Sequence, residues 1–332
     1  MHVGYLGSGT WGFCLAYLLA KNGQKVTLWS RNEAFSKKLA ETRTHPKLKG
    51  ITAPLNITFT SDLSQAVNIA DILVESVTSK GLRPVMELVL RVRPKPCPII
   101  LTSKGIEQDT GLLLPEVLCQ LLQEKNSPKV GALSGPSHAE EVIQDLPTSV
   151  VCTGYTPDIM GTILDIFTTP NFRIYPNSDV MGVSFGGAMK NIIAIACGIS
   201  DGLGFGDNTK AALMTRGLHE IRKLSITKGC KETTLNGLSG MGDLCVTCLS
   251  THSRNYRFGR CIAEGLTVAE AKAKIGMVVE GMYSVVSALQ LAKKHGIPVP
   301  ITEGVHAIIY HNLNPKDAVK ALLQRAIKEE HL

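Results

Sequence analysis

A single lysine lies within an otherwise apolar stretch, residues 182–200. At the period of a helix, one face of this stretch carries small or apolar residues around the lysine: Val183, Gly186, Gly187, Lys190, Ala194 and Cys197. The opposite face is apolar too, so the pattern predicts a helix that is buried nearly all round. Burial removes water from an ammonium group and lowers its pKa from the usual value of about 10.4. Lys190 is therefore a candidate proton-transfer group; the alternative is a core helix whose lysine extends to the surface.

Two adjacent glycines, Gly186 and Gly187, interrupt this predicted helix one turn before the lysine. Each glycine costs a helix interior roughly 1 kcal/mol relative to alanine. We therefore expect another part of the molecule to approach the helix backbone closely here.

The N-terminus carries a second pattern with a chemical meaning, Gly7-Ser8-Gly9-Thr10-Trp11-Gly12. It follows a predicted strand at 2–6 and precedes a predicted helix at 13–21 and a strand at 25–29. In this context G-x-G-x-x-G predicts a dinucleotide site. Gly7 permits the tight turn, Gly9 lets backbone amides reach a pyrophosphate, and Gly12 lets helix and strand pack closely. The helix N-terminus adds N–H donors and a partial positive charge; a glycine-rich turn without a ligand is the alternative.

The end of the second predicted strand bears on the choice of cofactor. A site selective for NAD usually places an acidic residue about 20 residues after the glycines, bonded to the ribose hydroxyls. Here Ser30-Arg31-Asn32 occupies that place, and the first acid is Glu33. Arg31 could pair with a 2′-phosphate, so we expect NADP(H) to be preferred and NAD(H) to be possible. The alternative is a solvated surface arginine.

Alternation of strands and helices continues to about residue 177. The pattern predicts further strands at 71–77, 98–103, 130–134, 148–153 and 172–175, with helices near 111–123 and 157–168. Only helices are predicted afterwards, including one at about 209–223. We therefore expect an α/β protein with an N-terminal Rossmann-type, doubly wound parallel sheet (1–178) followed by an all-α C-terminal domain (179–332). Lys104 and Ser137 follow predicted strands, where ligands of such sheets gather.

Three polar groups stand out in the helical half. Gly237–Asp243 is predicted to be a loop that presents Asp243, and Ser253-Arg254-Asn255-Tyr256-Arg257 is a plausible anion clamp. Glu280 follows the apolar pair Val278-Val279, as a solvent-exposed helix start would.

Residues 201–207 are also expected to form a loop. The C-x-x-C pair at 245 and 248 has no second pair nearby, so no metal site is predicted.

Bulk properties describe an ordinary globular protein. Of 332 residues, 44% are hydrophobic and 19% charged, and the net charge of +7 would suit an anionic ligand. No basic stripe indicates nucleic acid, and no signal peptide is expected. The longest uninterrupted apolar run, 192–199, is too short to span a bilayer. Nine scattered cysteines favour reduced thiols and a cytoplasmic location.

Taken together, the chain resembles the bacterial NAD(P)-dependent glycerol-3-phosphate dehydrogenases over essentially its full length. Seven segments carry the resemblance in the family's order: G-S-G-T-W-G at 7–12, S-K-G-I-E at 103–107, S-G-P-S-H-A-E-E at 134–141, G-G-A-M-K-N-I-I-A-I at 186–195, G-M-G-D-L at 240–244, S-R-N-Y-R-F-G at 253–259 and V-V-E-G at 278–281. The resemblance implies an enzyme that interconverts sn-glycerol 3-phosphate and glycerone phosphate, mostly by reduction, and so supplies phospholipid synthesis. Its implied partner is this small phosphate substrate, with no nucleic acid and no membrane, and relatives suggest a homodimer.

The resemblance also assigns roles to individual residues. Lys190 matches the proton acceptor. Positions that match substrate-binding residues are Lys104, Gly135, Ser137, Lys190, Asp243, Ser253, Arg254 and Asn255, and Asn191 and Thr247 resemble further residues lining the substrate. Positions that match dinucleotide-binding residues are Thr10, Trp11, Arg31, Lys104, Ala139, Arg254, Val278 and Glu280, beside the three glycines.

The residues leave two alternatives open, and they depart from the family's pattern at one place. A related two-domain dehydrogenase acting on a β-hydroxy acid or 6-phosphogluconate would share much of the pattern, and a catalytically silent NADPH-sensing module would share the first half. The chain departs from its relatives at Glu75-Ser76-Val77, where they carry an apolar run ending in proline. The contacts of this strand end with the cofactor are therefore left open.

Overall fold

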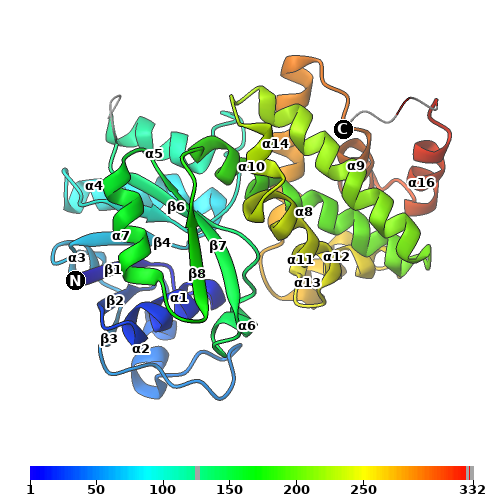
Figure 1. Ribbon diagram of the computed structural model, residues 1–332. Coiled ribbons are helices and arrows are strands. Elements are labelled where there is room, and N and C mark those ends of the chain that lie inside the picture. Colours follow the sequence, from blue (N-terminus) through cyan, green and yellow to red (C-terminus); the bar gives the residue numbers. More distant parts are fainter. Residues whose placement is uncertain (124–127, 327–328, 330–332) are drawn as a thin grey trace. The chain divides into compact units, whose positions relative to one another are not determined.

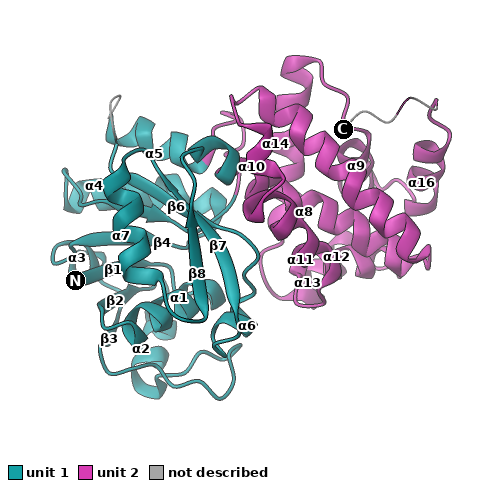
Figure 2. Ribbon diagram, viewed as in Figure 1, with its two compact units in different colours: residues 1–104, 114–183 teal, residues 105–113, 184–332 magenta. Residues whose placement is uncertain are grey.

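A computed structural model describes residues 1–123, 128–326 and 329. The chain forms two compact units (Figure 2). The first comprises residues 1–104 and 114–183, and the second comprises residues 105–113 and 184–332. The segment 105–113 thus groups with the helical unit although it lies between two parts of the first unit in the sequence, which the sequence pattern did not indicate.

The first unit is built on an eight-stranded sheet of order β3-β2-β1-β4-β5-β6-β7-β8. Its strands are β1 (His2–Leu6), β2 (Lys25–Trp29), β3 (Ile57–Thr60), β4 (Ile72–Glu75), β5 (Ile99–Leu101), β6 (Val130–Ser134), β7 (Thr148–Gly154) and β8 (Phe172–Pro176). All neighbours pair in parallel except β6 and β7, which are antiparallel. The predicted Rossmann-type sheet is confirmed, with one antiparallel pairing and with β3 added at the edge.

Helices cover both faces of this sheet (Figure 1). They are α1 (Thr10–Lys21), α2 (Glu33–Thr42), α3 (Leu63–Val67), the 3₁₀ turn η1 (Ser79–Gly81), α4 (Leu82–Val92), α5 (Leu114–Leu122), α6 (Ala139–Val142) and α7 (Pro157–Phe167). Helix α1 contacts α6 and α7, and helix α4 contacts α3 and α5, so these helices form two groups.

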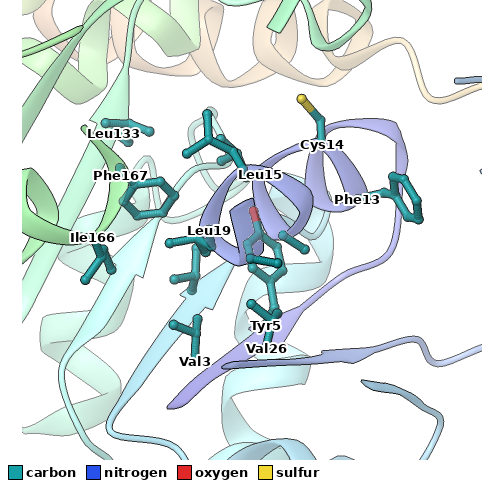
Figure 3. Close-up of a cluster of buried hydrophobic side chains, with 14 of the residues drawn as sticks. Val3, Tyr5, Phe13, Cys14, Leu15, Leu19, Val26, Leu133, Ile166 and Phe167 are labelled. Atoms are coloured by element: carbon teal, nitrogen blue, oxygen red, sulfur yellow. The ribbon is translucent and has the colours of Figure 1, made fainter. Parts of the chain in front are cut away.

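The core of the first unit lies where α1 and α7 pack on the strands. Figure 3 shows Leu15 and Leu19 of α1 beside Tyr5 of β1 and Phe167 of α7. All four side chains are fully buried. The central strands read as continuous apolar runs because helices cover them from both sides. This core fixes the glycine turn between β1 and α1.

The second unit is helical. Its elements are most of α8 (Val180–Gly202), α9 (Gly206–Ile226), α10 (Glu232–Leu235), the π-helix η2 (Leu238–Gly242), α11 (Asp243–Leu249), α12 (Arg254–Ala263), α13 (Val268–Ile275), α14 (Glu280–His295), α15 (Pro300–His311) and α16 (Pro315–Leu323). Asp179 Oδ1 accepts a 2.8 Å hydrogen bond from the Gly182 amide and caps α8.

Helix α8 is buried nearly all round, as predicted: every residue from Phe185 to Ser200 is buried. By length and composition alone this 23-residue helix is long and apolar enough to cross a membrane, although its uninterrupted apolar run is shorter. However, 83% of the apolar window is buried inside the protein. Such burial is typical of the core helix of a soluble protein.

Two predicted loops are wrong in this unit. The loop expected at 201–207 is only residues 203–205, because α8 continues to Gly202 and α9 begins at Gly206. The loop expected at 237–243 is the π-helix η2, which runs directly into α11. Asp243 is therefore the first residue of a helix rather than part of a loop.

Candidate active site

The glycine turn between β1 and α1 has the geometry of an anion-binding turn. Gly7 has φ of +108°, a conformation that favours glycine, and a Cβ there would lie 2.9 Å from the Ser76 carbonyl oxygen. A Cβ on Gly12 would collide with the Gly7 carbonyl oxygen, so helix and turn pack as the motif predicts. A Cβ on Gly9, in contrast, would meet no atom within 4 Å. Gly9 therefore leaves its side of the turn open for a ligand.

Two further observations at the start of α1 fit a bound pyrophosphate. Gly9 is the N-cap residue and provides no side-chain hydrogen bond to the first amides of the helix. Thr10 Oγ1 is buried and has no hydrogen-bond partner in the described part of the chain. Uncapped amides and an unpaired buried hydroxyl are donors that an anion at a helix N-terminus would satisfy. The residues of this turn thus fit a dinucleotide.

The side chain of Arg31 is exposed, just beyond the end of β2. Asn32 is occupied elsewhere, because its Oδ1 accepts a 2.9 Å hydrogen bond from the Phe35 amide and caps α2. Glu33 forms a surface ion pair with Lys37 (2.9 Å), one turn along the same helix. These local contacts engage Asn32 and Glu33 but not the charged side chain of Arg31.

Glu75 ends β4 and is completely buried. Its Oε1 accepts a 2.5 Å hydrogen bond from the Val77 amide, and its Oε2 accepts a 2.6 Å hydrogen bond from Ser103 Oγ. The carboxylate therefore ties the segment after β4 to the segment after β5, directly before Lys104. This contact explains a carboxylate in an otherwise apolar strand.

Lys104, Gly135 and Ser137 meet beyond the ends of β5 and β6. The Gly135 carbonyl oxygen accepts hydrogen bonds from Lys104 Nζ (3.1 Å) and from Ser137 Oγ (2.9 Å). Gly135 has φ of +141°, and a Cβ there would lie 3.0 Å from the Val150 Cα atom. Ala139 follows as the first residue of α6 and is 7% exposed. One cation and two hydrogen-bonding groups are thus gathered at the edge where such sheets bind ligands.

Lys190 lies inside the helical unit with two polar partners. Its Nζ donates hydrogen bonds to Asp243 Oδ1 and to Thr247 Oγ1, the second at 2.8 Å. The side chains of Lys190 and Asp243 are only 11% and 1% exposed. Thr247 Oγ1 in turn donates to the Asp243 backbone oxygen (2.6 Å), so both partners lie one turn apart on α11. The alternative of a lysine that extends to the surface is wrong.

The glycine at 186 has the explanation that the sequence suggested. A Cβ on Gly186 would lie 2.5 Å from the Ser239 carbonyl oxygen and 3.0 Å from the Gly240 Cα atom. Both atoms belong to the π-helix η2, which ends one residue before Asp243. The close packing of η2 on α8 therefore sets the position of Asp243 beside Lys190.

A second chain of buried hydrogen bonds starts at Asn191, the residue after Lys190 on α8, and links it to α12 and α14. Asn255 Nδ2 donates to Asn191 Oδ1 (2.9 Å), and Asn255 Oδ1 accepts from the Gly281 amide (2.9 Å). Ser253 Oγ accepts from the Tyr256 amide (3.2 Å) and caps α12. Arg254 is the first residue of α12 and is half-buried.

At the start of α14, the structure partly confirms the expected exposure. Val278 is 38% exposed, whereas Glu280 is half-buried as the first residue of the helix. Hydrogen bonds thus join Lys190 to Asp243 and Thr247, and Asn191 to Asn255, with Ser253 and Arg254 directly before Asn255 in the chain. In the residues that the structure describes, no group of three or more His, Cys, Asp and Glu side chains could hold a metal.

A glycine-turn sheet unit joined to a helical unit that buries a lysine–carboxylate pair defines a two-unit, nucleotide-dependent dehydrogenase. Comparisons with known proteins support this class and refine it. The family described as "NAD-dependent glycerol-3-phosphate dehydrogenase N-terminus" matches residues 2–159, and the corresponding C-terminus family matches residues 179–320. The chain belongs to the NAD-dependent glycerol-3-phosphate dehydrogenase family.

Individual relatives match over almost the whole chain. The protein named glycerol-3-phosphate dehydrogenase [NAD(P)+] from Protochlamydia amoebophila is 58% identical over 330 residues, which is 99% of both chains. The protein of the same name from Chlamydia pneumoniae is 52% identical over 331 residues, 100% of this chain and 99% of the other. A crystal structure of glycerol-3-phosphate dehydrogenase from Coxiella burnetii superposes with a TM-score of 0.93 at 36% identity, covering 98% of this chain and 99% of the other.

Proposed function

We propose that this chain catalyses the NAD(P)-dependent interconversion of sn-glycerol 3-phosphate and glycerone phosphate. Relatives named glycerol-3-phosphate dehydrogenase [NAD(P)+] match the chain over almost its whole length, and this similarity supports the choice of substrate. The structural observation that carries the proposal is Lys190, buried with its Nζ bonded to Asp243 and Thr247. In the cell we expect reduction of the ketone in the cytoplasm, which supplies glycerol 3-phosphate for phospholipid synthesis.

We assign nucleotide binding to residues 1–178 and substrate chemistry to residues 179–332. The residues proposed to hold the cofactor are Gly7, Gly9, Thr10, Trp11, Gly12, Arg31, Lys104, Ala139, Arg254, Val278 and Glu280. When bound, the nicotinamide supplies hydride transfer. The exposed Arg31 favours NADP(H), since a guanidinium pairs well with a 2′-phosphate, and NAD(H) is also accepted.

Lys190 is proposed to move the proton that accompanies the hydride. In the direction of oxidation its amine takes the proton of the C2 hydroxyl, and in the direction of reduction its ammonium returns that proton to the oxygen of the former ketone. Asp243 stabilises the ammonium form, because charge-assisted hydrogen bonds are the stronger kind. Thr247 fixes the position of Nζ from a second direction.

The phosphate of the substrate needs cations and hydrogen-bond donors. We assign this role to Lys104 and to the pair Arg254 and Asn255, and we propose Gly135, Ser137 and Ser253 as further substrate-binding residues. A guanidinium suits a phosphate because its planar N–H groups can bind two oxygens at once. Holding the phosphate would orient C2, and good orientation can contribute several kcal/mol to catalysis.

A steady-state assay with glycerone phosphate and NADPH tests this function directly. We expect saturable oxidation of NADPH, measured by absorbance, and none with a β-keto acid or with the product of 6-phosphogluconate oxidation. Turnover of a β-keto acid alone would assign the chain to a related dehydrogenase instead. Binding of NADPH without any turnover would indicate a sensing module. Sedimentation of the same sample tests the homodimer that we also propose.

A further inference from the structure

A cavity of about 630 Å³ lies within the helical unit, lined by residues of α8, α9, α15 and α16. Its volume falls in the range typical of small-molecule sites. None of its lining residues belongs to the set proposed above for cofactor or substrate. On α8 the lining residue nearest to Lys190 in the chain is Ala196, six residues or about 9 Å along the helix axis away. It is therefore a separate site.

Helix α9 gives the cavity a gradient from apolar to cationic. The lining residues of α9 recur at helical spacing and so form one stripe: Thr209, Ala212, Leu213, Arg216, His219, Glu220 and Lys223. The N-terminal part of the stripe is mostly apolar, and the C-terminal part holds three basic side chains. The other walls are mostly apolar, with Ile301, Val305 and Ile308 on α15 and Val319 and Leu322 on α16, and one further basic residue, Arg325, lines the cavity just after α16. A ligand with one apolar end and one anionic end would match this arrangement.

The basic side chains lie close enough to act on one another. The pKa of His219 is lowered from 6.5, first by burial and then by the positive charges of Lys223 and Arg216. Glu220 is the single carboxylate in the stripe, and it has a structural role. Its oxygens accept hydrogen bonds from the amides of Ile301 (2.6 Å) and Thr302 (3.1 Å), so it caps the start of α15.

An unsatisfied hydroxyl provides an independent indication of a missing partner. Ser200 lines the cavity and is 1% exposed, and its Oγ has no hydrogen-bond partner in the described part of the chain. Buried hydroxyls are almost always hydrogen-bonded, to protein, water or ligand. The unpaired Ser200 hydroxyl indicates that a polar partner, either water or the head of a ligand, reaches this part of the cavity.

We propose that this cavity binds a single-chain anionic amphiphile, with its chain between the apolar walls and its head beside Arg216, His219 and Lys223. The cationic stripe excludes a cation, and the apolar walls would leave most of an inorganic anion without partners. This assignment does not depend on the reaction proposed above, because it uses other residues and is measured by binding alone.

Isothermal titration of the full-length protein with decanoate and with decyl phosphate, both below micelle formation, tests the proposal. We expect saturable binding of one molecule per chain for at least one of the two, which also tells a carboxylate from a phosphate head. Decyl glucoside, with the same chain and no charge, should bind at least tenfold more weakly. Inorganic phosphate at equal concentration should not compete.

Gly304 offers a variant that fills the cavity. It lies on α15 and lines the cavity, and a Cβ there meets no atom within 4 Å. Gly304→Leu should therefore fold and reduce amphiphile affinity at least tenfold. Gly161→Leu is the matched control, since Gly161 is also an open helical glycine but lies on α7 of the first unit. The double variant Arg216→Gln, Lys223→Gln should weaken binding at least fivefold and reduce its dependence on salt.

Several results would overturn the proposal. They are an absence of saturable binding, undiminished affinity in Gly304→Leu, equal affinity for the charged and uncharged decyl compounds, or competition by inorganic phosphate. A change of the sedimentation coefficient in Gly304→Leu would instead mark this face as an interface between copies of the chain. Circular dichroism of each variant verifies that it is folded.

Discussion

Lys190 and Asp243 form a buried ion pair although 53 residues separate them in the chain. The lysine comes from the centre of α8 and the carboxylate from the first residue of α11. Removing one member of a buried pair leaves an uncompensated charge, which costs about 3–5 kcal/mol. The pair therefore ties the position of the proposed proton-transfer group to the folding of the helical unit.

Thr247 is predicted to matter through its hydroxyl alone. Thr247→Val keeps the shape but removes the 2.8 Å hydrogen bond to Lys190 Nζ, and we expect kcat to fall about tenfold, or roughly 1.4 kcal/mol. Thr247→Ser keeps the hydroxyl and should retain most of kcat. Equal kcat in the valine and serine variants would show that the hydroxyl does not position Lys190.

Arg31 is predicted to set the preference between the two cofactors. Arg31→Gln should raise KM for NADPH about 10- to 100-fold, the worth of one charge-assisted hydrogen bond of about 1.5–3 kcal/mol. KM for NADH should change little, because NADH has no 2′-phosphate. Parallel steady-state titrations with both cofactors measure the ratio. An equal rise for both cofactors would mean that Arg31 does not recognise the 2′-phosphate.

Gly186 is predicted to be needed for the packing of η2. Gly186→Ala places a Cβ 2.5 Å from the backbone oxygen of Ser239, so η2 must move. We expect a loss of about 1–3 kcal/mol in unfolding free energy and a lower kcat, because η2 leads directly to Asp243. Gly161→Ala, where a Cβ meets no atom within 4 Å, should instead stabilise by up to about 1 kcal/mol. Unfolding in urea compares the two variants.

The buried Glu220 predicts how stability depends on pH. Burial raises its pKa from 4.5 to about 7, despite hydrogen bonds from Ile301 and Thr302 that act in the opposite direction. Between pH 4.5 and 7 the unfolded chain loses this proton while the folded chain keeps it, so the contribution of Glu220 to stability falls as the pH rises. This loss of unfolding free energy is about 3 kcal/mol at most, and it is complete above pH 7. Glu220→Gln should remove this decline.

In the first unit, His45 makes stability depend on pH in the opposite direction. Burial, followed by the charge of Lys47, lowers its pKa from 6.5 to about 4. The unfolded chain binds this proton as the pH falls from 6.5 to 4 while the folded chain does not, so stability is lost in that window. Both Glu220→Gln and the unaltered protein contain His45, so the contribution of His45 cancels when their stabilities are compared at each pH. An unchanged pH dependence in Glu220→Gln would contradict the assignment.

Much of the sheet could be predicted from the sequence. The strands at 2–6, 25–29 and 130–134 have the predicted bounds, because strands covered on both faces are apolar throughout and glycines or charged residues mark their ends. β3 was missed, since Ile57-Thr58-Phe59-Thr60 is a short, partly exposed edge strand. The antiparallel pairing of β6 with β7 depends on long-range topology, which residue patterns do not record.

The candidate site, too, could be predicted from the sequence only in part. Lys190 was identified by its apolar helix, and the glycine turn by its motif. The π-helix η2 was missed because three glycines in Gly237–Gly242 resemble a loop, whereas packing against Gly186 stabilises a helical turn there. The link from Glu75 to Ser103 was missed as well, because hydrogen bonds between strand ends arise only once the sheet is assembled.

The most direct test of the account is the turnover of Lys190→Ala with glycerone phosphate and NADPH, measured beside NADPH affinity by fluorescence titration. We expect kcat to be abolished while NADPH binds as tightly as before, since Lys190 transfers the proton and does not bind the cofactor. A variant that keeps a tenth of kcat, a difference of only about 1.4 kcal/mol in the barrier, would remove Lys190 from the chemistry.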